Sequence, residues 1–276
     1  MKKKAIIILA LVLVISIISN ITVIMSANAQ DNKFESATSS INTVVKDPTE
    51  NIKTTRVITT ENGEKSVTYK STFYNSVDDY IHEYCDDLGD RYNLNDSGNV
   101  VEFYSSYNNK KVIEENLENG ILSSKTEEEI KGIALKKLKT ELPDSFDDYA
   151  MTVCEFDDYN DSYMIRFTKS YGKDGFIVGE EFGLQVHISG RIFSWAKINV
   201  DQLADFDSSR LDGVTRSKVE AYGCNQVSAK YNINIDKLEA TAFQLVKINE
   251  YYAIRVYIAN KDLAENNVMD MVYYEV

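Results

Sequence analysis

The sequence has few of the residues that most often carry catalysis or bind metals. Its 276 residues include three cysteines and two histidines, and no cysteine stands in a C-x-x-C arrangement. It contains no H-E-x-x-H, no G-x-S-x-G and no glycine-rich phosphate loop, so metalloprotease, serine hydrolase and nucleotide chemistry lack the motifs they use. Carboxylates are so abundant that any catalytic spacing arises by chance. We therefore predict a protein that is not an enzyme, with no catalytic, cofactor-binding or metal-binding residue.

The cysteines and histidines have structural explanations. An odd cysteine count in an exported chain leaves at least one free thiol. Cys85 falls in an apolar stripe, where a small buried side chain is expected, and a Cys154–Cys224 disulfide remains open. His82 shares a face of an expected helix with acidic residues and should be solvated and weakly paired. His187 alternates with core positions and should point outward from its strand.

Basic residues are also scarce. Lysine and arginine total 30 against 43 aspartates and glutamates, which gives a formal charge of −13. Such a surface repels a phosphate backbone, so we expect no nucleic-acid partner. A basic partner would be attracted, although the charge is also explained by solubility alone. The 43% hydrophobic content is enough for the core of one or two small domains.

The amino-terminal end has the pattern of an export signal. Lysines at positions 2–4 precede an uncharged run, and an A-x-A pattern follows at residues 27–29. We expect residues 1–29 to be a signal peptide or, since the run is long enough for a spanning helix of about 20 residues, a membrane anchor. The polar residues 30–52 should form a disordered linker. The protein is therefore expected to be secreted or otherwise extracytoplasmic, and to meet the membrane only through this segment.

Residues 126–200 set the expected architecture. Thr126 followed by Glu129 predicts a capping box at a helix start, and apolar residues recur from Ile130 at i, i+3, i+4 and i+8. The helix should end before Pro143. Beyond it the apolar period becomes 2, which predicts half-buried antiparallel strands and an α+β layer pair. The inward strand positions are Tyr163, Ile165, Phe167, Phe182, Leu184, Val186 and Ile188.

The flanking segments repeat parts of this order. Asn62-Gly63 predicts a β-hairpin turn, and apolar spacing predicts a helix over 76–92, followed by a strand over 100–104. A helix over 215–231 should precede three more strands. We therefore expect tandem helix-plus-antiparallel-sheet units. The expected boundaries are 53–120 for a hairpin, helix and strand that form a partial repeat, 121–205 for the central unit, and 206–276 for a second such unit.

One stretch of the central segment carries a family pattern. A helix precedes a strand, a turn of the form G-aliphatic-x-G and a strand that ends in V-x-x-x-G-x-I, over residues 121–200. In this order the segment resembles the PepSY-like domains of secreted Gram-positive proteins. The usual Asp of the family is replaced by Ser189. Its motifs are structural, so the resemblance implies a fold and transfers no catalytic residue. The matching positions are Gly175, Ile177, Gly179, Val186, Gly190 and Ile192.

The resemblance also implies a function, because PepSY-like units are associated with peptidase propeptides and are proposed to inhibit or chaperone proteases. Our first hypothesis is a non-enzymatic protein that binds a partner such as a peptidase at the cell surface, by pairing at an open sheet edge. The alternative is a cell-wall glycan-binding module that uses Phe193 and Trp195 as an exposed aromatic contact surface. A second layer would instead bury both rings. A hydrolase that uses carboxylates is a third alternative.

Overall fold

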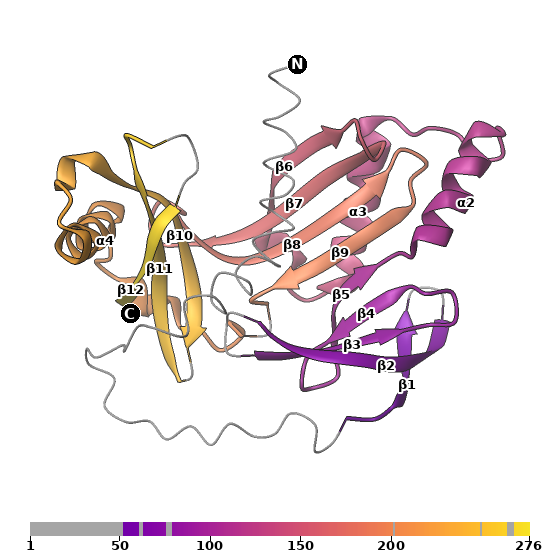
Figure 1. Cartoon of the computed structure of the whole chain (residues 1–276), viewed down its shortest axis with the longest axis horizontal. Coiled ribbons are helices and arrows are strands. Elements are labelled where there is room, and N and C mark those ends of the chain that lie inside the picture. The colour runs from indigo at the N-terminus through magenta and orange to yellow at the C-terminus, as the bar shows by residue number, and fades with distance from the viewer. Residues whose placement is uncertain (1–51, 61–62, 76–78, 201, 249, 264–267) are drawn as a thin grey trace. The chain divides into compact units, whose positions relative to one another are not determined.

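The computed structural model describes residues 52–60, 63–75, 79–200, 202–248, 250–263 and 268–276 (Figure 1). The expected signal peptide or anchor over 1–29 lies outside these residues, as does the expected linker up to residue 51. In the described residues no helix is both long enough and apolar enough to cross a membrane. The described residues divide into two compact units, one within 52–84 and 94–99 and the other within 85–93 and 100–276. The boundaries expected at residues 121 and 206 stay predictions.

Strands dominate the described part of the chain, which holds twelve strands and three α-helices. The helices are α2 (Tyr107–Glu118), α3 (Glu127–Glu141) and α4 (Arg216–Tyr231), with short 3-10 helices η1 (Phe146–Asp148), η2 (Ser208–Leu211) and η3 (Ile235–Lys237). The strands are β1 (Thr55–Thr60), β2 (Gly63–Asn75), β3 (Asp79–Cys85), β4 (Arg91–Leu94), β5 (Val100–Tyr104), β6 (Ala150–Asp157), β7 (Ser162–Tyr171), β8 (Ile177–His187), β9 (Ile192–Ile198), β10 (Leu238–Ile248), β11 (Tyr251–Asn260) and β12 (Val268–Glu275).

The expected fold class, tandem helix-plus-antiparallel-sheet units, is wrong. All twelve strands belong to one mixed sheet. The reason lies at β8, which pairs antiparallel with β7 and β9 and, at Val178↔Gln244, parallel with β10. A long connection that contains α4 separates β9 from β10, and such a connection lets a strand return in parallel, whereas a hairpin does not. The strands of the middle and of the C-terminal segment are therefore continuous through β8.

In the smaller unit, β1 and β2 confirm the predicted hairpin, with pairing that runs to Thr60↔Gly63. The helix predicted over 76–92 is wrong, because β3 and β4 occupy its described part. A turn separates these two strands. The Oδ1 atom of Asp86 accepts hydrogen bonds from the backbone N–H groups of Leu88 and Asp90, at 3.0 and 2.9 Å. Side-chain-to-backbone bonds of this kind favour a turn over a helix, despite the helical spacing of the apolar residues.

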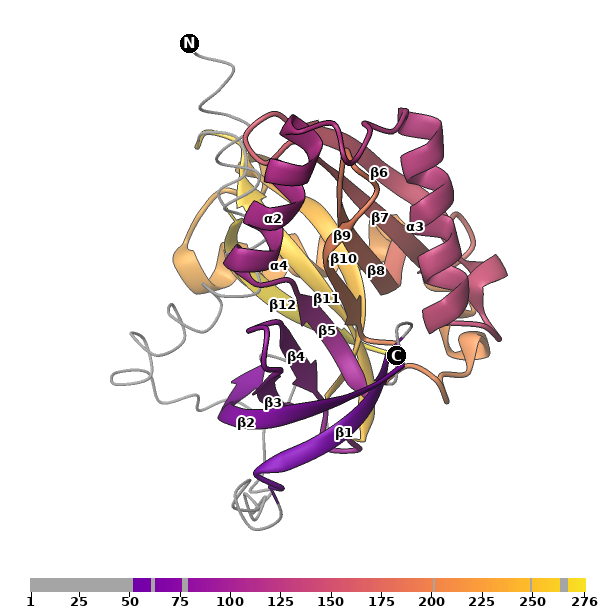
Figure 2. The ribbon, with the colours of Figure 1, turned by 90° about the vertical axis from the view of Figure 1, so that its right-hand side faces the viewer.

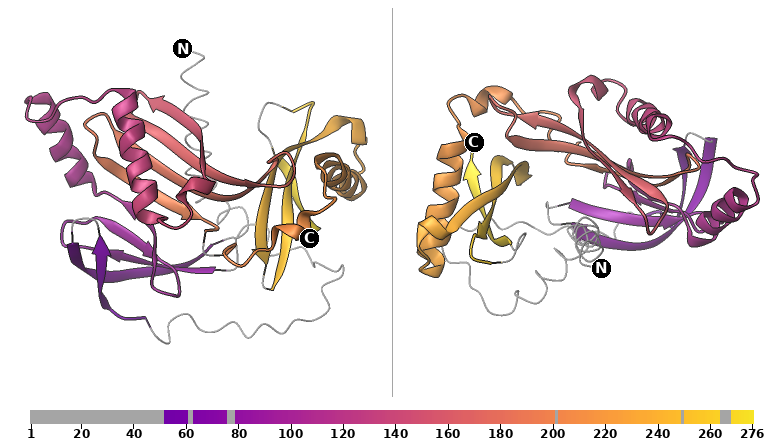
Figure 3. Two further views of the ribbon diagram at one scale, coloured as in Figure 1. Left: turned by 180° about the vertical axis from the view of Figure 1, so that it is seen from behind. Right: turned by 90° about the horizontal axis from the view of Figure 1, so that it is seen from above.

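Helix α3 forms as predicted. The Oγ1 atom of Thr126 accepts from the N–H group of Glu129 at 3.3 Å, and the Glu129 carboxylate accepts from the N–H group of Thr126 at 2.8 Å, which confirms the capping box. The buried face of α3 packs on one face of the sheet formed by β6 to β9 (Figure 3). Each fully buried apolar side chain in this core contributes roughly 1.5–3 kcal/mol. The core includes Ile130, Ala134, Leu138, Ile165, Phe167, Phe182, Leu184, Val186 and Trp195.

Helix α4 and strands β10 to β12 also form where the sequence predicts them. A Cβ atom added at Gly223 would lie 2.9 Å from Ile258 Cδ1 and 3.1 Å from Val256 Cγ1, so the glycine lets α4 approach the strands closely. Ile177, at the start of β8, belongs to this second core. Asn199 holds β8 beside β10, because its side-chain N–H group donates to backbone carbonyls of both strands, at 3.2 and 3.4 Å.

Helix α2 has no counterpart among the sequence predictions. None of its residues is buried, so no apolar stripe marks it. Ser106 caps it by accepting a hydrogen bond from the N–H group of Asn109 at 3.2 Å. The Asp90 carboxylate accepts from the Ser106 N–H group at 2.7 Å and from the Asn109 side chain at 2.8 Å. Helix α2 lies beside β9 (Figure 2), where Lys110 Nζ is 5.0 Å from the ring centroid of Phe193.

Candidate functional site

The expected aromatic contact surface is buried. Phe193 and Trp195 are 2% and 7% exposed. Trp195 pairs with Leu184, so its side chain lies on the α3 side of β9. Phe193 instead falls at the register shift between β8 and β9 and packs against His187 and Lys110. The Trp195 ring lies in the α3 core beside Phe182, with a centroid distance of 6.0 Å. Phe193 stacks on His187, with a centroid distance of 4.8 Å. Of the two alternatives for these rings, burial holds, and the glycan-binding alternative loses the exposed residues on which it depended.

No disulfide joins the cysteines in the described part of the chain. Cys154 on β6 packs against the α3 core, whereas Cys224 lies inside the α4 core, so the two side chains serve different clusters and form no disulfide. Burial raises the pKa of both the Cys154 and the Cys224 thiols. Both are therefore protonated near neutral pH and are poor nucleophiles.

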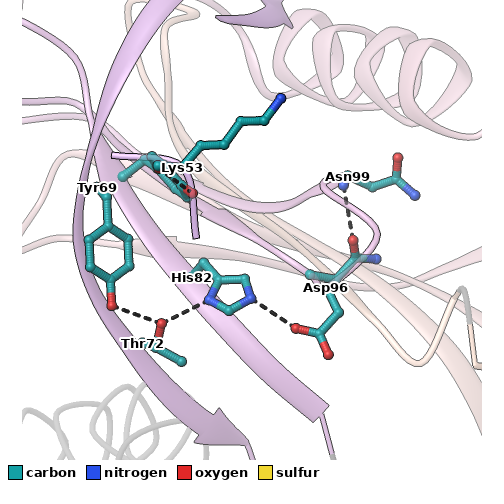
Figure 4. A network of polar contacts seen from close by, with 8 residues as sticks. Lys53, Tyr69, Thr72, His82, Asp96 and Asn99 are labelled. Atoms are coloured by element: carbon teal, nitrogen blue, oxygen red, sulfur yellow. Dashed lines mark hydrogen bonds and ion pairs between the residues drawn. The ribbon is translucent and has the colours of Figure 1, made fainter. Parts of the chain in front are cut away.

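His82 is buried, at 6% exposed, and not solvated as the sequence suggested, because it lies on β3 and not on a helix. Its Nδ1 atom is 2.8 Å from the Thr72 hydroxyl, and its Nε2 atom is 2.8 Å from the Asp96 carboxylate. The Tyr69 hydroxyl extends this series of hydrogen bonds, because it lies 2.9 Å from Thr72 Oγ1. Figure 4 shows this chain from Tyr69 through Thr72 and His82 to Asp96.

Hydrogen-bonding rules fix the direction of each bond in this network when the imidazole is neutral. The Asp96 carboxylate can only accept, so Nε2 carries the proton and Nδ1 accepts from the Thr72 hydroxyl. Thr72 Oγ1 then accepts from the Tyr69 hydroxyl. The network joins β2, β3 and the turn that holds Asp96, and its evident role is to hold that turn in place.

His187 also departs from expectation. It is 1% exposed, and its Nδ1 atom is 2.9 Å from the Ser189 hydroxyl. Burial lowers its pKa, with a partial offset from the negative charges of Asp161 and Glu114. Its imidazole is therefore a neutral part of the packing near α2 and cannot act as an exposed ligand.

Strand β6 is an open edge of the sheet. In the described part of the chain it is hydrogen-bonded only to β7, so its outer side presents backbone N–H and C=O groups that can pair with another strand. Strand β12 likewise pairs only with β11 among the described strands. Five of the eight residues of β6 are exposed, against three of eight in β12. Strand β6 is therefore the more accessible of these two edges.

The side chains of β6 also fit an interface. Met151 and Phe156 are 37% and 42% exposed, on the side of the strand that faces the α3 layer. Phe156 is held by the Tyr163 ring, with a centroid distance of 5.0 Å. The strand contains neither lysine nor proline, two residues that commonly protect a sheet edge from pairing. A bulge between Met151 and Val153 is its one irregularity.

The second candidate region is the face of the sheet opposite α3. No described helix covers this face, which is turned toward the viewer in Figure 1. Directly paired residues form a row across four strands, Glu102↔Ala196, Ala196↔Gly183 and Gly183↔Arg166. Since cross-strand pairs project to the same side of a sheet, this row places Glu102 and Arg166 on the uncovered face with two small residues between them.

The charged groups of this row differ in their partners. Arg166 Nε is 3.3 Å from the Glu181 carboxylate, so that charge is neutralised. Glu102 Oε2 instead accepts from the Asn93 side-chain N–H group at 2.6 Å and from the Tyr104 hydroxyl at 3.4 Å. Burial raises the pKa of Glu102, and these two hydrogen bonds and the charge of Arg91 offset the rise only in part.

Sequence reasoning missed this row, although two signals for it exist. Glu102 is the single charge in the run V-V-E-F-Y, where a buried or half-buried carboxylate has to find partners. Gly183 stands inside a predicted strand, and glycine at such a position often marks a close approach by another group. Which residues share the row depends on the register of four strands, which local patterns do not specify.

Among the described residues, no group of three His, Cys, Asp or Glu side chains is arranged to hold a metal ion. The chain matches no family model and no curated protein. A solved structure, the Bacillus megaterium YpeB C-terminal domain, is similar to this chain with a TM-score of 0.33 and 9% sequence identity, over 80% of this chain and 89% of that one.

Proposed function

We propose that this chain is a non-enzymatic, extracytoplasmic protein that binds a partner protein, such as a peptidase, and modulates it. The observation that carries the proposal is the open edge of β6, with its exposed Met151 and Phe156. Strand addition at such an edge draws affinity from backbone hydrogen bonds and specificity from alternate side chains. The export pattern at residues 1–29 and the PepSY-like sequence pattern support the location and the class of partner.

The partner segment is an extended strand that lies along β6. Apolar side chains on it would cover Met151 and Phe156, which together give this edge a hydrophobic contact of the kind that dominates binding energy at interfaces. Glu155, also exposed on β6, and the overall charge of −13 favour a partner strand with basic residues.

Site-specific photo-cross-linking tests the proposal. The full-length chain carries a benzoylphenylalanine at position 156, and a matched control carries it at position 107, where Tyr107 is 79% exposed on α2. We expect position 156, and not 107, to cross-link one exported protein of the producing cell. The purified partner, if it is a peptidase, should lose or change activity when this chain is added.

Charge substitutions provide the second half of the test. Met151→Lys and Phe156→Lys place a cation on the edge and should weaken binding of the purified partner about tenfold or more. Tyr107→Lys should leave it unchanged. Equal cross-linking at both positions, or a partner that tolerates both lysines, would show that β6 is not the interface.

A further inference from the structure

An open space, here called the hollow, lies above Gly183 in the middle of the row across the uncovered face. A Cβ atom added at Gly183 would have no atom within 4 Å, so the space above the middle of the sheet is open. Ala196, its neighbour on β9, adds one methyl group to the same floor. Three interstrand steps separate Glu102 from Arg166, about 14 Å at the usual strand spacing. The floor of the hollow between the two charged residues is therefore formed by two small residues, Ala196 and Gly183.

At one end of the row lies a carboxylate that has no direct ion pair, although the positive charge of Arg91 also acts on it. Glu102 is half-buried and forms no ion pair with any described residue, whereas Glu181 on the same face is paired with Arg166. The two hydrogen bonds to Glu102 both end on Oε2, which leaves Oε1 for another donor. A half-buried carboxylate is stabilised most by a cation that also donates hydrogen bonds.

The neighbouring Asn93 provides an independent observation. Its side chain is only 4% exposed. Its Nδ2 group donates to Glu102, so the amide points toward that carboxylate. Its Oδ1 atom is buried and accepts no hydrogen bond from the described residues. Buried acceptors are nearly always satisfied in folded proteins. Glu102 Oε1 and Asn93 Oδ1, on two residues joined by a hydrogen bond, are therefore two acceptors for which the described residues provide no donor.

We propose that Glu102 and Asn93 form a subsite for an ammonium or guanidinium group whose aliphatic stem lies over Gly183 and Ala196. The cationic head donates to Glu102 Oε1 and, with a small shift of the amide, to Asn93 Oδ1. An ammonium or guanidinium group offers several N–H donors and no acceptor, which matches this pair of acceptors. The aliphatic stem of the bound group fills the open space above Gly183. A larger side chain at position 183 would occupy the same space. This subsite does not depend on pairing at β6.

Binding of defined probes to the full-length chain tests the subsite, with the amide NMR signals of Gly183 and Tyr104 as the readout. The cationic probes are N-acetyl-lysine methylamide and N-acetyl-arginine methylamide, and the neutral control is N-acetyl-norleucine methylamide. Both cationic probes should shift these signals and the neutral control should not. Glu102→Gln should weaken binding about 10- to 100-fold, the usual weight of a hydrogen bond to a charged group.

Two variants separate the subsite from general electrostatics. Gly183→Val fills the hollow without removing a charge and should abolish binding, whereas Glu181→Gln removes a paired carboxylate from the same face and should change affinity less than about threefold. Because valine is more favourable than glycine in strands, Gly183→Val should unfold at the same urea concentration as the natural chain or at a slightly higher one. The inference is overturned if the neutral probe binds as well as the lysine probe, if Glu102→Gln binds normally, or if no cationic probe shifts the two signals.

The source of the cation is decided by two further probes. n-Butylammonium represents a small free amine, and a pentapeptide with one central lysine flanked by alanines represents a protein side chain. Tighter binding of the peptide by about tenfold or more, equal to one added interaction of about 1.4 kcal/mol, assigns the site to a lysine of a partner chain. Equal affinities assign it to a free amine. Binding of neither contradicts the proposal.

Discussion

The substitution Gly179→Ala should destabilise the protein by about 2–4 kcal/mol. A Cβ atom at Gly179 would overlap the Tyr171 ring, at Cε2 and Cδ2. The Tyr171 hydroxyl donates to Glu180 Oε1 at 2.6 Å, and Glu180 is 3% exposed and also accepts from Tyr149 at 2.6 Å. Moving the ring therefore both strains the packing and breaks a hydrogen bond to a buried carboxylate.

The magnitude follows from three contributions. Overpacking costs about 1–3 kcal/mol, and a lost hydrogen bond to a charged group costs about 1.5–3 kcal/mol. The half-exposure of the Tyr171 ring lowers both costs. Replacing glycine stabilises by about 0.4–1 kcal/mol, because the unfolded chain has fewer conformations. Gly183→Ala on the same strand meets no atom within 4 Å, so only the last contribution applies and the chain should be unchanged or slightly more stable.

Urea unfolding followed by circular dichroism measures both variants. With a slope of about 2 kcal/mol/M, the midpoints of Gly179→Ala and Gly183→Ala should differ by about 1 M or more. In a Tyr171→Ala background the ring is absent, and Gly179→Ala should then cost less than about 0.5 kcal/mol. Equal midpoints for the two single variants, or a full cost that persists without the ring, would refute the role assigned to Gly179.

Three further outcomes are expected. His82→Ala removes two part-buried hydrogen bonds of a buried imidazole and should lower the free energy of unfolding by about 1–3 kcal/mol in urea titrations; a loss below about 0.5 kcal/mol would contradict the network. Burial raises the Glu102 pKa above its ordinary 4.5, so stability from this group is present below pH 4.5 and lost as pH rises through the folded pKa. The stability difference between the natural chain and Glu102→Gln should fall across that interval, and a flat difference would exclude the shift. Trp195 is 7% exposed, so acrylamide should quench its fluorescence only weakly. The fluorescence intensity should not change when peptidoglycan fragments are added.

Local signals in the sequence identify some elements well. The helix that begins after Thr126 is predicted because its capping box, apolar stripe and terminating proline agree. The alternation that buries Phe182 and Leu184 is likewise a property of one strand. In these cases neighbours along the chain carry the information, so no knowledge of distant contacts is needed.

Other features depend on contacts between distant residues. Tyr80, Ile81 and Tyr84 have helical spacing yet lie on β3, because aromatic and β-branched residues are equally suited to strands. The direction of Trp195 depends on how β9 pairs with β8, and a one-residue change in register reverses every side chain. The parallel contact of β8 with β10 and the row from Glu102 to Arg166 arise in the same way, so neither could be predicted from single segments.

Hydrogen exchange of the backbone amides, in the free chain and in the complex with the partner cross-linked through position 156, tests the central claim most directly. Strand addition at β6 predicts that those amides of residues 150–157 that point away from β7 exchange quickly in the free chain and slowly in the complex, while those of β12 do not change. Protection that appears on β12 or α4 and leaves β6 unchanged would contradict the account.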